Sequence, residues 1–338
     1  MNKNQYRLIF SRVRNMLIAV EETAGAAGNA AGGEAVCATE CVAQFGFVRF
    51  TLRRIALAAL IVAGVTPMWA VAQIVGGGPH APSVIQTQSG IPQVNINKPT
   101  GGGVSLNTYN QFDVQKPGII VNNSPVIVNT QQAGFINGNP NFGPNDAARI
   151  IVNQVNSPNV TQIRGAIEIA GSKAQLVIAN PSGVYLDGAG FINTSRAVIT
   201  SGVPFYGPDG SLAGYNVSKG LVTVAGSGLN AANVDAVDIL ARAVQANAAI
   251  YAKNLRVVTG PNQVNHDTLA ATPIQGDGPA PTVAVDVAQL GGMYADRILL
   301  IGTERGLGVS NAGVIAAQAG DLIPSSGRPT RIAGQDDR

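Results

Sequence analysis

Residues 166–202 read AIEIAGSKAQLVIANPSGVYLDGAGFINTSRAVITSG and decide the fold. Short apolar runs alternate with Gly, Asn and Pro, and no helical period runs through them, so the segment predicts short strands separated by turns. At its centre Asn180-Pro181-Ser182-Gly183 follows the apolar run Leu176 to Ala179, as a tight turn follows a buried strand. The fold must therefore repeat a unit of strand, turn and strand.

Composition favours an elongated all-β protein. Of 338 residues only 12% are charged and 5% aromatic, while 41 are Gly, which is unusual for a soluble enzyme or a helical bundle. The net charge of +3 comes from residues 1–72, because residues 73–338 hold 15 basic and 15 acidic side chains. A neutral body of this kind argues against nucleic acid as a partner.

Internal repetition predicts a solenoid. The segment 249–258, AIYAKNLRVV, matches GMYADRILLI at 292–301 in its apolar positions, and VIAAQAGDL at 314–322 continues the pattern. We interpret the offsets of 43 and 22 residues as two turns and one turn of a period near 21.5. The peptide Ala-Gly-Phe-Ile-Asn also occurs twice, at 133–137 and 189–193, and is interpreted as another echo of the repeat.

A repeat this short cannot bury its own apolar face, so its turns must stack through parallel ladders about 4.8 Å apart. We therefore predict an all-β, right-handed parallel β-helix with small extra β elements. Asparagines at corners, such as Asn122 and Asn123, are expected to stack their amides from turn to turn. A β-sandwich also has many short strands but gives no reason for the period. Residues 233–252 fit a short helix as well as strands.

The front of the chain predicts a cleaved leader. Met1 to Glu22 is basic and amphipathic, and alone it would allow a first helix or a transit peptide. A basic segment at 49–54, an 11-residue apolar run at 55–65 and Ala70-Val71-Ala72 then form a secretory signal pattern. That run is too short to span a bilayer. We predict cleavage after Ala72, with Gln73 as the new N-terminus, so that Cys37 and Cys41 leave with the leader.

The chain contains few candidate catalytic residues. His80 lies in a Gly/Pro stretch, and His266, beside Asp267, is expected in an exposed turn. Gly226 to Ala231 fits G-x-G-x-x-A but lacks α/β surroundings, so a turn between coils is preferred. The carboxylates that a glycan-cleaving β-helix would need are expected to be solvated: Glu168, Asp187, Asp235 and Asp238. We predict no catalytic residue, no cofactor and no metal site.

Residues 1–22 resemble a known protein family. The pattern MNK-x-x-YR-x-IF, followed by R-x-ML-x-x-V-x-E, resembles the extended signal-peptide region of two-partner secretion exoproteins of Gram-negative bacteria, which include filamentous haemagglutinins and contact-dependent inhibition proteins. The blocks from Val94 to Asn123 are similar to the N-terminal secretion domain of that family. The D-x-x-D-I-L-A-R-A block that begins at Asp235 also matches, and on that resemblance residues 233–252 are expected to form strands.

Two turns carry the sharpest match. The family has an NPNL-like and an NPNG-like motif, and these are similar to Asn139-Pro140-Asn141-Phe142 and Asn180-Pro181-Ser182-Gly183. The resemblance implies recognition by an outer-membrane transporter, through folding of the corner rather than direct reading of side chains. Read from the residues alone, Asn caps a turn, Pro presets φ and Gly supplies positive φ. Many relatives carry a cysteine pair where this chain has Tyr185 to Gly190.

We therefore expect four segments: an extended signal region at 1–22, a spacer and signal peptide at 23–72, a secretion β-helix at 73–322 and a polar tail at 323–338. The expected function is that of a non-enzymatic, monomeric secretion module that is exported through the periplasm to the surface or medium and has no effector of its own. Its partners are the transporter's periplasmic domains and a host or neighbouring-cell surface. The alternatives are a β-helix polysaccharide-active enzyme and a truncated free-standing module that occupies the transporter.

Overall fold

The computed structural model describes residues 6–11, 16–21, 73–318 and 322–326. The predicted cleavage residues Ala70 and Ala72 and both cysteines lie outside them. The chain divides into two compact units, residues 1–69 and 70–338. In the first, β1 (Tyr6–Ser11) and β2 (Met16–Glu21) form an antiparallel hairpin in place of the helix that the amphipathic pattern allows.

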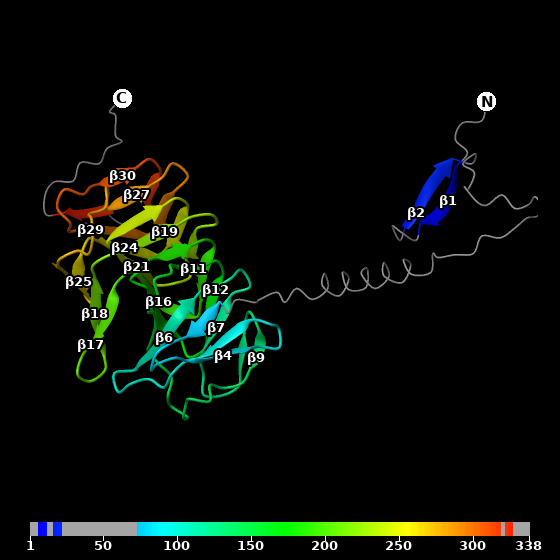
Figure 1. Ribbon diagram of the computed structural model, residues 1–338, viewed down its shortest axis with the longest axis horizontal. Helices are drawn as coiled ribbons and strands as arrows, with labels where there is room; N and C mark the ends of the chain where they lie inside the picture. The colour runs from blue at the N-terminus through cyan, green and yellow to red at the C-terminus, as the bar shows by residue number, and fades with distance from the viewer. Residues whose placement is uncertain (1–5, 12–15, 22–72, 319–321, 327–338) are drawn as a thin grey trace, which may run out of the picture. The chain divides into compact units, whose positions relative to one another are not determined.

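The second unit is a parallel β-helix with three faces, as predicted (Figure 1). Sheet 1 contains β3 (Ile74–Gly76), β6 (Val104–Phe112), β10 (Ile150–Val155), β13 (Ala174–Ala179), β16 (Thr194–Thr200), β21 (Ala236–Ala241), β24 (Asn254–Thr259), β29 (Arg297–Gly302) and β32 (Leu322–Ser326). Sheet 2 contains β4 (Ser83–Gln86), β5 (Pro92–Asn95), β7 (Ile119–Asn123), β12 (Ala166–Gly171), β15 (Ala189–Ile192), β20 (Leu229–Ala231), β23 (Ala249–Ala252), β28 (Gly292–Ala295) and β31 (Val314–Ala317). Sheet 3 contains β11 (Thr161–Ile163), β14 (Val184–Leu186), β19 (Leu221–Val224), β22 (Ala243–Ala246), β27 (Val285–Val287) and β30 (Val309–Asn311).

Each coil runs from sheet 2 to sheet 1 to sheet 3 and then begins again one strand further along. Within the coils all pairing is parallel; β3 and β4 pair antiparallel with β6 and β5 and cover the N-terminal end of sheets 1 and 2. The ambiguous residues 233–252 are β21, β22 and β23 with their turns, so strand was the right choice. Strand β32 extends sheet 1 into the segment expected to be the polar tail.

The 43-residue offset spans one coil, and the prediction of two coils was wrong. Leu255 of β24 pairs directly with Ile298 of β29, so no coil lies between them. The extra length is an excursion through β25 (Asn262–Asn265) and β26 (Ala271–Pro273), which pair antiparallel outside the stack. The shortest coil takes 18 residues, from Val237 to Leu255, and the 22-residue offset from Met293 to Ile315 is also one coil.

Two antiparallel additions cover outer faces of the helix. Strands β17 (Val203–Tyr206), β18 (Leu212–Val217), β25 and β26 form a four-stranded sheet whose apolar side chains pack with outward-facing residues of sheet 1 such as Val198 and Leu240. The smaller one, β8 (Val128–Thr130) with β9 (Gly134–Ile136), packs Ile136 with Ile120 and Ala170 of sheet 2. These are the extra β elements expected from the sequence.

The twin Ala-Gly-Phe-Ile-Asn peptides are not structural equivalents, which corrects their interpretation as repeats. The copy at 189–193 lies in the stack, where Phe191 is 2% exposed in the main core. The copy at 133–137 lies in the β8–β9 hairpin, where Phe135 is 75% exposed. Identical local sequence takes opposite environments because only the second copy pairs with coils on both sides.

Corner asparagines bind mainly backbone carbonyls of neighbouring coils. One amide pair of the expected ladder exists, Asn122 Nδ2 to Asn95 Oδ1 at 3.0 Å. The next position in that register is Ala170, so the ladder ends there. Elsewhere Asn193 Nδ2 reaches Ile169 O and Asn233 Nδ2 reaches Phe191 O, both on the preceding coil. Side-chain amides thus satisfy carbonyls where the chain leaves the ladders.

Replacing the phenylalanine of each Ala-Gly-Phe-Ile-Asn peptide with alanine tests whether the two copies have different environments. Phe191→Ala empties a filled core site and should lower the free energy of unfolding by about 3–5 kcal/mol. Phe135→Ala should change it by no more than about 0.5 kcal/mol, because the ring is already in solvent. Urea unfolding of the two variants measures both values, and equal losses would contradict the assignment.

Candidate functional site

The turn Asn180–Gly183 is a corner between sheet 1 and sheet 3 that ties three successive coils together. Asn180 donates its backbone N–H to Thr200 O of the next coil at 2.9 Å. Its Nδ2 donates to Asn159 O and Thr161 Oγ1 of the preceding coil, at 2.8 and 2.9 Å. The side chain is fully buried, so its amide is held between backbones rather than offered to solvent.

Within that corner Asn180 and Gly183 have the roles expected from the sequence. Ser182 donates its N–H to Asn180 Oδ1 at 2.9 Å, and Gly183 donates to Asn180 O at 2.9 Å, which closes the turn. Gly183 has φ of 111°, and a Cβ there would lie 2.6 Å from Leu221 O. Only glycine combines that φ with so close an approach of a neighbouring coil.

The turn Asn139–Phe142 repeats the same internal geometry at another corner, between sheet 2 and sheet 1. Asn141 donates its N–H to Asn139 Oδ1 at 3.0 Å, and Phe142 donates to Asn139 O at 3.1 Å. Asn139 Nδ2 donates to Ile96 O and Asn122 O, both at 2.9 Å. Asn139 is buried, Phe142 packs against the main core, and only Pro140 and Asn141 are exposed.

The structure therefore does not bring the two predicted motifs into one site, because they occupy different corners. What they share is a buried Asn whose amide joins separate strands. Chemically such a turn can fix chain direction and join coils. Gln73, the predicted first residue of the mature chain, accepts a hydrogen bond from the Asp113 N–H at 2.7 Å. Of the three predicted cleavage residues Ala70, Ala72 and Gln73, it alone lies within the described part.

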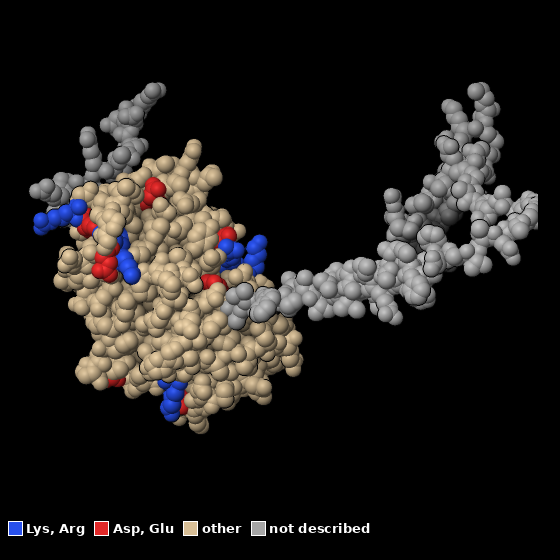
Figure 2. All heavy atoms as spheres, in the orientation of Figure 1, with Lys and Arg blue, Asp and Glu red and all other residues tan. Residues whose placement is uncertain are grey.

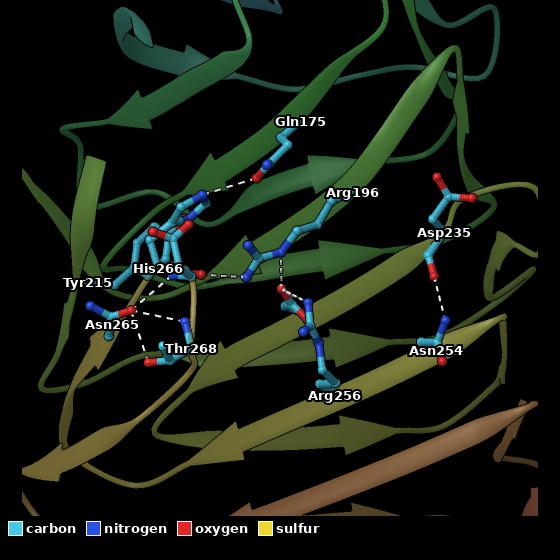
Figure 3. A network of polar contacts seen from close by, with 11 residues as sticks. Gln175, Arg196, Tyr215, Asp235, Asn254, Arg256, Asn265, His266 and Thr268 are labelled. Atoms are coloured by element: carbon cyan, nitrogen blue, oxygen red, sulfur yellow. Dashed lines mark hydrogen bonds and ion pairs between the residues drawn. The ribbon is translucent and has the colours of Figure 1, made fainter. Parts of the chain in front are cut away.

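A polar network that sequence reasoning missed lies between sheet 1 and the four-stranded addition (Figure 3). Asp238 is fully buried and ion-paired with Arg196 and Arg256. Arg196 also donates to His266 O at 2.7 Å, which fastens the addition to the helix. The expectation that Asp238 is solvated was wrong. Apolar Leu240, two residues on and on the same outward face, was the signal that this face is covered.

His266 was expected in an exposed turn, and this was also wrong, because its side chain is 1% exposed. Its ring lies between Tyr215 and Gln175 (Figure 3): Nδ1 is 2.8 Å from the Tyr215 hydroxyl and Nε2 is 3.0 Å from Gln175 Oε1. With Oε1 as acceptor, Nε2 carries the proton and Nδ1 accepts from tyrosine. Burial, reinforced by the Arg196 guanidinium, lowers the pKa of His266 to about 4.

The remaining candidates have structural partners. Glu168 is buried, against expectation, and accepts from the N–H groups of Gln131 and Gln132. Asp187 accepts from the Ser227 N–H, and the Gly226–Gly228 segment is a turn between coils, as predicted. Asp235 is exposed, as expected, and His80 is also exposed.

The described residues hold no cluster of three His, Cys, Asp or Glu side chains that could bind a metal ion. No helix among them is long and apolar enough to cross a bilayer. On the face seen in Figure 2, basic and acidic side chains lie in small separate groups on a mostly uncharged surface. Such a surface lacks the basic stripe that nucleic-acid binding would need.

Two family matches together cover most of the chain. Residues 73–329 match the TPS secretion domain, and residues 1–50 match the Extended Signal Peptide of Type V secretion system. Among similar proteins, "tRNA nuclease CdiA-2" of Burkholderia pseudomallei is 60% identical over 97% of this chain. "Toxin CdiA" of Yersinia pestis is 43% identical over 96% of it. The chain spans 10% of the length of each of these relatives.

A solved structure of the filamentous hemagglutinin secretion domain has the same architecture. It superposes with a TM-score of 0.65 and is 29% identical in sequence. The match covers 75% of this chain and 99% of the other. The coil stack is thus similar to the whole of that solved chain.

Replacing Gly183 tests the corner. Gly183→Ala should lower the free energy of unfolding by at least about 2 kcal/mol, because it combines a disfavoured φ with a clash against Leu221 O. Gly308→Ala is the matched control, since nothing lies within 4 Å of a Cβ there and φ is ordinary, and it should stay within about 0.5 kcal/mol. Equal unfolding midpoints for the two variants would contradict the geometry.

The buried His266 predicts acid sensitivity. Its pKa is lower folded than unfolded, so only the unfolded chain takes up the proton between about pH 6.5 and pH 4, and the free energy of unfolding falls as pH falls through that window. We expect protonation of this histidine in the unfolded chain to lower the free energy of unfolding by about 2 kcal/mol between about pH 7 and pH 5. In the variant His266→Gln the free energy of unfolding, measured in urea at both pH values, should change with pH by that much less. The same pH slope in both proteins would show that His266 is not responsible.

Proposed function

Because this chain belongs to the TPS secretion domain family, we propose that it is the secretion module at the front of a haemagglutinin- or adhesin-like exoprotein. The observation that carries the proposal is the match of residues 73–329, which contains the whole coil stack with both Asn-Pro corners. The nuclease and toxin names belong to the longer relatives, of which this chain spans only a tenth.

The proposed route runs through the periplasm. Residues 1–22 are the extended signal region and residues 23–72 the spacer and signal peptide. Cleavage follows Ala72, and the start of the secretion-domain match at residue 73 supports that position. An outer-membrane transporter then recognises the mature chain through its periplasmic domains and passes it to the surface or medium. A host or neighbouring-cell surface is the proposed destination of the full exoprotein.

The Asn-Pro corners act in this scheme as folding elements. Asn139 and Asn180 are buried with their amides bound to backbone, which supports a role through the shape of the corner rather than direct contact with the transporter. We propose that the folded module then nucleates further coils outside the cell. Sheets 1, 2 and 3 end in β32, β31 and β30, whose outer edges are the template for that growth.

Polysaccharide cleavage finds less support. Asp238 is ion-paired with two arginines, and both oxygens of Glu168 accept backbone hydrogen bonds. A glycosidase needs two carboxyl groups free to face one bond. We therefore propose that this module is not an enzyme.

Co-expression with the cognate transporter tests the function. The full chain should reach the medium only when the transporter is present, because export depends on that partner. Asn180→Ala and Asn139→Ala should reduce the secreted amount. Asn145→Ala, at an exposed turn position beside the first motif, should leave it unchanged. Equal secretion with and without the transporter would overturn the proposal.

A further inference from the structure

The β8–β9 hairpin and the two residues before it expose large apolar side chains to solvent. Val126, Ile127 and Phe135 are 64%, 67% and 75% exposed, among the most exposed large apolar residues of the described part. Phe135 pairs with Asn129 across the hairpin, and Ile127 lies two residues before Asn129, so Phe135 and Ile127 are diagonal neighbours on one face. We call Val126, Ile127 and Phe135 the hairpin patch.

The hairpin patch is held in a fixed place. The opposite face of the hairpin, with Val128 and Ile136, packs on sheet 2. The buried carboxylate of Glu168 accepts the N–H groups of Gln131 and Gln132 at 2.6 and 2.9 Å, which anchors the hairpin turn. A buried carboxylate thus holds the turn of a hairpin whose other face exposes Ile127 and Phe135, with Val126 exposed beside them. Such an arrangement is typical of an interaction surface.

The segment that forms this surface carries no charged side chain. Residues 117–145, which include the whole hairpin and the first Asn-Pro motif, contain no Lys, Arg, Asp, Glu or His. Exposed strands and apolar patches usually carry charged residues that prevent unwanted association. An uncharged patch also has nothing with which to bind nucleic acid or an acidic glycan. The chemistry fits an apolar protein surface.

Coils that continue the stack beyond β31 lie away from the patch. The hairpin packs on β7 and β12, whereas the last strand of sheet 2 is β31, five strands beyond β12 in the sheet order. Five strand spacings are about 24 Å. Figure 1 shows β9 at the end of the stack where the secretion domain begins, and β29 and β30 at the other end. Coils added after β31 lead away from the hairpin.

We propose that the hairpin patch is the surface on which the periplasmic domain of the outer-membrane transporter docks. This inference rests on the proposed function and names the contact surface for it. The hairpin ends at Ile136, three residues before Asn139, so docking occurs next to the first motif. Its pairs join residues four to eight positions apart, so the hairpin can form before the coils have stacked.

Photo-crosslinking in cells tests the contact. A photo-reactive phenylalanine analogue replaces Phe135 in the full chain, which is co-expressed with its transporter. The control carries the analogue at Val203, an apolar residue 42% exposed on the other addition. Light should give an adduct recognised by transporter antibody from position 135 and none from position 203.

Charged substitutions give the second readout. The double variant Ile127→Asp/Phe135→Asp should be secreted less than Val203→Asp, while urea unfolding of all purified mature chains stays close to that of the unaltered chain. Absence of the 135 adduct, or equal secretion of these variants, would overturn the docking surface while the unaltered chain still needs its transporter. Secretion of the unaltered chain without any transporter would overturn the proposed function and this inference together.

Discussion

The constraint on which the structure depends is that no coil can satisfy its own backbone. A coil, which takes as few as 18 residues, has no partner for the N–H and C=O groups of its short strands except the coils before and after it. Parallel ladders on three faces meet that need, and they place the small and branched side chains of each coil over those of the next in one continuous core. The low charge and high glycine content of the sequence follow from this arrangement.

At the corners the chain leaves the ladders, and asparagine side chains supply the hydrogen bonds there. Asn139 and Asn180 each close a turn with the side-chain oxygen and use the amide nitrogen to bind carbonyls of other strands. Gly183 allows the chain to pass within contact distance of the neighbouring coil. The motifs that mark the TPS secretion domain family in this chain are therefore parts of the fold, and their effect on export is expected to act through it.

Local signals made the coil architecture predictable. Apolar runs ended by Asn, Pro and Gly located the strands and turns between Ala166 and Gly202, and the match of Ile250 to Met293 identified true ladder partners. The number of coils was not predictable, because an excursion such as β25–β26 lengthens a coil without changing its register. The burial of Asp238 and His266 was missed because the four-stranded addition that covers sheet 1 is built from segments far apart in the sequence. The local signs were the alternation of Val264 with His266 and that of Asp238 with Leu240.

Amide hydrogen exchange on the folded mature chain tests most directly whether the Asn-Pro motifs are parts of the coil stack. The N–H groups of Gly183 and Phe142 close the two turns, while those of Asn180 and Asn139 donate to Thr200 O and Ser124 O. They should exchange as slowly as the central strand β13, because the buried side chains of Asn139 and Asn180 tie both turns to the coil stack. Fast exchange at these four amides, with β13 still protected, would show that the motifs are free loops and would contradict the account.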